Sequence, residues 1–84
     1  MFTFTREQSS AIAAIEVTSN NEVNIAYQSN PDRFYTFTAS EDIITEIEER
    51  AAKVLMNVPM LSMGRFISEI IKDGNLKQVE LTAV

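Results

Sequence analysis

The spacing of the apolar residues changes at Ser40, and this change decides which folds the chain can adopt. Before Ser40, Val23, Ile25 and Tyr27 alternate with polar or small residues, which is the period of a half-buried strand. After it, apolar residues recur mostly in steps of three or four from position 44 to position 58, which is the period of a helix with one apolar face. Strands followed by helices in a chain of 84 residues predict a single α+β domain.

Three segments before residue 40 favour strands, and turn residues separate them. The first covers residues 11–17, where the alanines blur the alternation and also leave a helix open. The second covers residues 23–28 and the third residues 34–38, which are aromatic or β-branched. The clusters at 19–21 and 29–32 have the composition of turns. Short turns between consecutive strands predict a three-stranded antiparallel meander.

Two helices and a last strand are predicted after the meander. Ser40 is the expected N-cap of the first helix, and Pro59 ends it because proline cannot donate to the helical hydrogen-bond ladder. The second helix begins near Ser62 and ends at Gly74, which can take the left-handed conformation common after a helix. Residues 76–84 alternate again and predict a final strand that returns to the sheet.

The composition removes most of the side chains that enzymes use near neutral pH. The chain has no histidine and no cysteine, so it lacks an imidazole base, a thiolate nucleophile and the usual zinc ligands. A serine nucleophile would need a lysine as its base, and no Ser-x-x-Lys arrangement is present. We therefore expect no catalysis, no cofactor and no metal site.

The charge balance argues against an uncomplicated surface for phosphates. Seven basic and 12 acidic residues give a net charge of −5, and five of the acids lie between positions 41 and 49. We interpret these acids as the solvated face of the first helix, with a docking surface for a basic partner as the alternative. No apolar run reaches the roughly 18 residues of a membrane span, and the start lacks the order of a signal peptide, so we expect a cytoplasmic protein without membrane contact.

The start of the second helix is the first candidate ligand site. Ser62 and Gly64 can expose free backbone N–H groups to an anion, with Arg65 closing on a phosphate. In the alternative, Ser62 only caps the helix, Gly64 allows close packing against the sheet, and Arg65 is solvated or salt-bridged.

Tyr35 and Phe37 form the second candidate, because they share one face of a strand. Aromatic side chains on a sheet can stack nucleobases. The alternative is that the pair lies under a helix as core, since a meander must bury one face.

Met56, Met60 and Met63 are the candidate interface residues, since they gather around the bend between the helices. Methionine side chains adapt to irregular surfaces and often line interfaces, so an exposed cluster here would support a dimer. A flexible filling of the core is the alternative.

Several of these residues, in this order, resemble the KTSC domain family, a short module of unknown role found at the end of some lysyl-tRNA synthetases and as a free-standing bacterial or phage protein. The resemblance extends from Gln8 to Ile71 and is carried by Ser9, Ser10, Ile12, Ile15, Val23, Ile25, Tyr27, Tyr35, Thr36, Phe37, Ser62, Gly64, Arg65, Phe66 and Ile67, with Ile70 or Ile71. The chain departs from the family in having Phe37 for a second tyrosine, residues 38–40 where a Val-Pro is expected, and a longer first helix. The resemblance implies that residues 1–84 form one small binding module, and the tRNA-handling enzyme hints at RNA.

Two functions follow as hypotheses. The first is a non-catalytic binding or regulatory module that acts through protein contacts, as an oligomer. The second is a module that binds RNA or a nucleotide, or sequesters a nucleotide, through the start of the second helix with Tyr35 as a stacking surface. Salt separates the two, because phosphate binding weakens steeply as salt rises.

Overall fold

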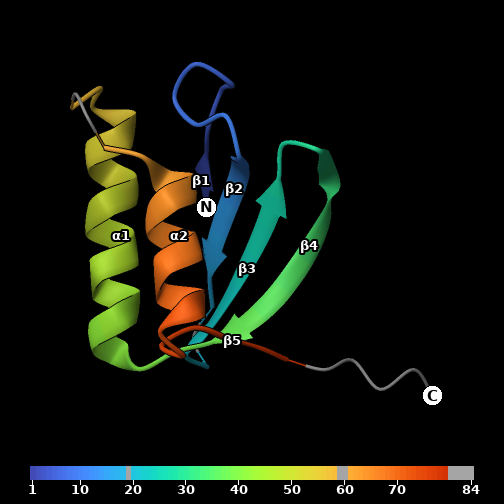
Figure 1. The fold of residues 1–84 in the computed structure, drawn as a ribbon, viewed down its shortest axis with the longest axis vertical. Helices are drawn as coiled ribbons and strands as arrows, with labels where there is room; N and C mark the ends of the chain where they lie inside the picture. The colour runs from blue at the N-terminus through green and yellow to red at the C-terminus, as the bar shows by residue number, and fades with distance from the viewer. Residues whose placement is uncertain (19, 59–60, 80–84) are drawn as a thin grey trace.

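The computed structural model describes residues 1–18, 20–58 and 61–79. In chain order the elements are β1 (Phe2–Thr3), β2 (Ile12–Val17), β3 (Glu22–Tyr27), β4 (Asn30–Thr38), α1 (Glu41–Leu55), α2 (Met63–Lys72) and β5 (Lys77–Gln78). The strands form one sheet in the order β1-β2-β3-β4-β5, and each neighbouring pair is antiparallel (Figure 1). The α+β class and the meander are confirmed, although the sheet has five strands.

The sheet differs from its prediction at β1 and at the start of β4. β1 was not predicted, and it pairs Phe2 with Ile15 and Thr3 with Ala14. β4 begins at Asn30, inside the segment predicted as a turn, and so is longer than the predicted strand. At the other end, β5 returns to β4 through the pairs Phe37 with Gln78 and Thr38 with Lys77. Residues 80–84 of the predicted last strand lie outside the described residues.

Both helices begin at the predicted serines. The Ser40 Oγ accepts a hydrogen bond from the Ile43 N–H at 3.4 Å, and two carboxylates follow in the first turn, where the helix dipole favours them. α1 ends at Leu55, before Pro59 can act, because Asn57 takes a left-handed φ of 60°. After α2, Gly74 takes the left-handed conformation with a φ of 79°, as predicted.

One hydrophobic core lies between the two helices and one face of the sheet (Figure 1). Its buried residues are Phe4, Ile12, Ile15, Val23, Ile25, Phe37, Ile44, Ile47, Ala51, Val54, Met63, Phe66, Ile67, Ile70 and Leu76. On the opposite face, Ala14 and Ala26 pair within a small separate cluster. Beside them the Asn24 amide donates to Glu16 at 3.3 Å, and the Thr36 hydroxyl donates to Asn24 at 2.7 Å. This second face has the mixed polar surface of a sheet that meets water on one side.

Candidate functional site

The start of α2 is organised by its own capping and packing. The Ser62 Oγ accepts a hydrogen bond from the Arg65 N–H at 3.2 Å, so the serine uses one of the free donors that an anion would need. Gly64 faces the beginning of β2, where a Cβ added to it would lie 2.7 Å from the Cβ of Ala11. Ser62 therefore caps the helix, and Gly64 allows the helix to pack closely against the sheet.

Arg65 points into solvent. Its side chain is 83 % exposed, and its Nε lies 4.0 Å from the Glu69 carboxylate one helical turn further on. Exposed pairs of this kind contribute only about 0.3–0.5 kcal/mol to stability. The guanidinium is thus accessible to an anion, and a phosphate-binding role for Arg65 stays a prediction.

The two aromatic candidates have different surroundings. Phe37 is 3 % exposed and lies in the core opposite Val23, as the packing interpretation expected. Tyr35 is half-buried, and its ring meets the ring of Tyr27 edge to face, with the centroids 5.9 Å apart. Tyr35 thus has Tyr27, and not Phe37, as its aromatic partner at the surface.

Arg33 completes this group, because its guanidinium carbon lies 5.1 Å from the centre of the Tyr35 ring. The group lies beside a shift in register between β3 and β4. Ala26 pairs with Phe34 while Tyr27 pairs with Asn30, so residues 31–33 have no partner on β3 and bulge out of β4. Arg33 and Tyr35 are two positions apart on one strand, so they share a face by strand alternation, a signal that the sequence contained. The turn composition of residues 29–32 was also visible in the sequence, but the register shift was not.

The Tyr27 phenol is expected to make stability fall at high pH. Burial, and then the neighbouring Tyr35, raises the pKa of Tyr27 above its ordinary value of 10.0. The folded chain therefore holds the phenol proton more tightly than the unfolded chain, so the contribution is complete below pH 10 and is lost as the pH rises through the folded pKa. Urea unfolding across this range should show a steeper loss for the wild type than for Tyr27→Phe. Parallel curves for the two proteins would contradict this assignment.

The methionines do not form one surface. Met63 is 1 % exposed and fills the core, as the alternative interpretation expected, whereas Met56 is 75 % exposed. Met60 lies outside the described residues. Val58, two positions after Met56, is also exposed, at 40 %. Met63, Phe66, Ile67 and Ile70 are spaced as one helical face, a signal for burial of Met63 that the sequence contained.

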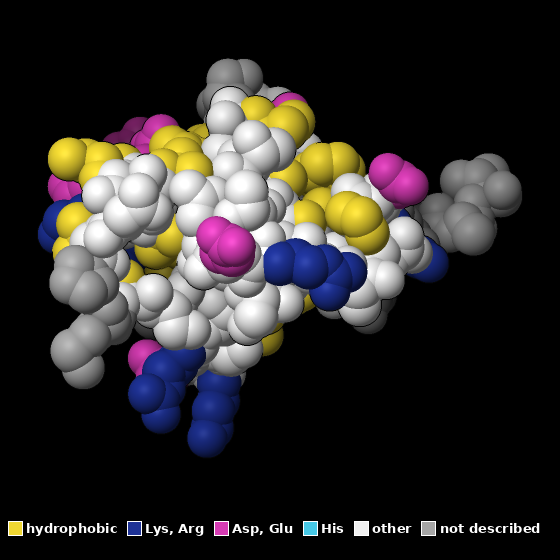
Figure 2. All heavy atoms as spheres, turned by 90° about the horizontal axis from the view of Figure 1, so that it is seen from above, with side chains coloured by type: hydrophobic (Ala, Val, Ile, Leu, Met, Phe, Trp, Pro, Cys, Tyr) yellow, Lys and Arg dark blue, Asp and Glu magenta, His cyan; other side chains and the backbone are white. Residues whose placement is uncertain are grey.

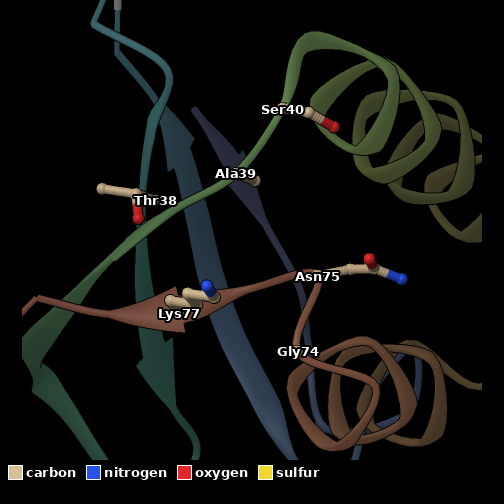
Figure 3. A pocket seen from close by; sticks show the side chains of 6 residues that line it. All are labelled: Thr38, Ala39, Ser40, Gly74, Asn75 and Lys77. Atoms are coloured by element: carbon tan, nitrogen blue, oxygen red, sulfur yellow. The ribbon is translucent and has the colours of Figure 1, made fainter.

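An open hollow of about 320 Å³ lies where β4 meets α1 and the end of α2 meets β5 (Figure 3). Its lining residues are Thr38, Ala39, Ser40, Gly74, Asn75 and Lys77. The side chains of Thr38 and Asn75 point in opposite directions and do not converge on one point (Figure 3). Lys77 favours an anion, but the carboxylates in the first turn of α1 oppose one. The hollow therefore has no clear preference for a charged ligand.

Comparison with known proteins assigns neither a family nor a function to the chain. No family model, curated protein or solved structure matches the chain. The resemblance to the KTSC family thus remains a proposal carried by the residues alone. Within residues 1–18, 20–58 and 61–79, no group of three or more potential ligands for a metal is present, and no helix has the length and apolar character needed to cross a membrane.

Proposed function

We propose that this chain is a non-catalytic binding or regulatory module of the KTSC type, which acts in the cytoplasm through protein contacts and associates with copies of itself. The exposed apolar pair at the end of α1, Met56 and Val58, is the observation that carries the proposal. Exposed apolar patches mark interaction sites, and these two exposed side chains are separated by one residue in the chain. A core built from so short a chain gains stability from association.

The backbone holds this pair in a defined position. After α1, the Asn57 N–H donates to the Val54 carbonyl at 3.0 Å, and the Val58 N–H donates to the Lys53 carbonyl at 3.1 Å. These two bonds form a Schellman motif around the left-handed Asn57. Because the segment is already ordered, less conformational entropy is lost when a partner covers it.

A second copy is the partner that we propose. Figure 2 looks onto the end of the molecule where α1 terminates, and hydrophobic side chains lie exposed there in several patches. Two copies can cover such a patch mutually around a two-fold axis. Each copy carries a net charge of −5, so their repulsion is screened by salt, and association should strengthen as salt rises.

Met56→Lys is expected to weaken self-association by on the order of ten- to a hundredfold, because burying a methionine contributes about 1.5–3 kcal/mol. Sedimentation equilibrium over a range of protein and salt concentrations measures this change. Ile71→Lys is the matched control, since Ile71 is also exposed, at 36 %, but lies near the far end of α2, away from the end of α1 (Figure 1).

Two outcomes of this experiment would count against the proposal. A wild-type chain that stays monomeric throughout the concentration range would remove self-association. An equal loss in Met56→Lys and Ile71→Lys would place the contact elsewhere on the chain.

A further inference from the structure

A separate binding surface lies at the end of the sheet where β3 turns into β4. Tyr27 and Tyr35 are half-buried there, with the edge-to-face contact described above. Both rings pack against the margin of the core, so their orientation is fixed while part of each ring stays open. Aromatic rings held in this way can stack planar ligands with little loss of side-chain entropy.

Arg33 adds a cation to this surface. It is exposed on the bulge of β4, with its guanidinium 5.1 Å from the centre of the Tyr35 ring. Among the described residues, the ion pair within 4.0 Å is that of Arg65 with Glu69. Arg33 therefore has no described carboxylate within that distance, and its guanidinium can meet a ligand. A guanidinium can both stack on a base and donate to phosphate oxygens.

We propose that Tyr27, Tyr35 and Arg33 form a binding site for a nucleobase that carries a phosphate. The base stacks against the tyrosines and the guanidinium, and the N–H groups of Arg33 contact the phosphate. A free nucleotide and a single strand share this chemistry. The net charge of −5 opposes any anion, so the stacking area must supply a large part of the affinity.

Tyrosine fluorescence tests the site directly, because the chain has two tyrosines and no tryptophan, and both tyrosines belong to the site. Titration with AMP and with a short oligoadenylate is expected to quench the tyrosine emission. Because adenine also absorbs the exciting light, free N-acetyltyrosinamide is titrated in parallel, and the quenching of the protein should exceed the loss of emission that it shows. Ribose 5-phosphate, which has no base, should leave the tyrosine emission unchanged. If AMP binds as tightly as the oligoadenylate, the ligand is a mononucleotide. If only the oligoadenylate binds, the ligand is a single strand.

Charge variants separate this site from the start of α2. Arg33→Gln is expected to weaken binding by on the order of tenfold, the effect of losing one charge-assisted contact. Arg33→Lys keeps the charge but loses the planar group, so it should recover only part of the affinity. Arg65→Gln is the control, because Arg65 is an exposed arginine on another element.

Three results would overturn the inference. The first is quenching no greater than that of free N-acetyltyrosinamide with either probe. The second is equal binding by the wild type and Arg33→Gln. The third is loss of binding in Arg65→Gln with Arg33→Gln unaffected, which would place the phosphate at the start of α2.

Discussion

Replacing Gly64 by alanine is expected to lower the free energy of unfolding by about 1–3 kcal/mol, the usual cost of adding a methyl group to a closely packed site. The new Cβ would lie 2.7 Å from the Cβ of Ala11, which is attached directly to the backbone and cannot turn aside. Alanine is the better helix former by about 1 kcal/mol, which offsets part of this cost. Chemical unfolding followed by circular dichroism measures the difference.

The variant Ala11→Gly provides the control for this prediction. It removes the atom that the new methyl group would strike, so the double variant should recover most of the stability lost in Gly64→Ala. A double-mutant cycle isolates this coupling, which is expected to lie at about 0.5–3 kcal/mol. If the two substitutions are additive, or if Gly64→Ala stabilises the protein, the packing explanation for Gly64 is wrong.

This result bears directly on function, because Gly64 belongs to the ligand site predicted at the start of α2. A glycine retained for the approach of a ligand can be replaced without loss of stability, whereas one retained for helix–sheet contact cannot. The 2.7 Å approach to Ala11 supports the second explanation. Ser62 is likewise used by the helix, so of the three residues in that predicted site only Arg65 has a side chain that takes no part in capping or close packing.

The parts of the fold that depend on local sequence were predictable. Both helix starts follow from serine caps, and the end of α2 follows from a glycine that takes a positive φ. The end of α1 was assigned to Pro59, but Asn57 reaches the left-handed region first, and the helix ends at Leu55. Asparagine tolerates that conformation better than most residues, so the sequence contained the signal in weaker form.

The parts that depend on distant contacts were not predictable. β1 has only two residues, and its pairing with β2 depends on tertiary contacts rather than on a repeated pattern. Likewise, the bulge of residues 31–33 beside Tyr27 depends on how β3 and β4 pair. A register shift of this kind is set by the pairing partners, and it leaves no period in the sequence.

Replacing Gln28 by alanine is expected to destabilise the protein by about 2 kcal/mol, because a net contribution of roughly 1 kcal/mol is lost for each of the two hydrogens that the side-chain amide donates. The Gln28 Nε2 lies within hydrogen-bond distance of three backbone carbonyls, those of Phe4 at 3.1 Å and of Ser9 and Ile12 at 3.2 Å, which share its two hydrogens. The Phe4 and Ser9 carbonyls belong to the segment that joins β1 to β2, and the Ile12 carbonyl is at the first residue of β2. One side chain at the end of β3 therefore anchors that whole segment.

Two variants make this prediction specific. Gln28→Glu keeps the shape but replaces the donor by a carboxylate, so its loss should exceed that of Gln28→Ala at neutral pH and should shrink when acid protonates the carboxyl group. Gln8→Ala is the matched control, because Gln8 is a glutamine of the same segment with one exposed hydrogen bond, from the Thr5 N–H to its Oε1 at 2.9 Å. We expect its cost to stay below about 1 kcal/mol.

Hydrogen exchange locates the effect of Gln28. The Phe4 N–H donates to the Ala13 carbonyl and the Ser9 N–H to the Thr5 carbonyl, so both amides report on the segment between β1 and β2. In Gln28→Ala they should exchange faster by a larger factor than the amides of α1, because the segment opens before the core does. An equal increase in all amides would show that Gln28 stabilises the fold as a whole. Because Tyr27 precedes Gln28 in the chain, the same anchor helps to fix the proposed stacking surface, and Gln28→Ala should weaken binding there as well.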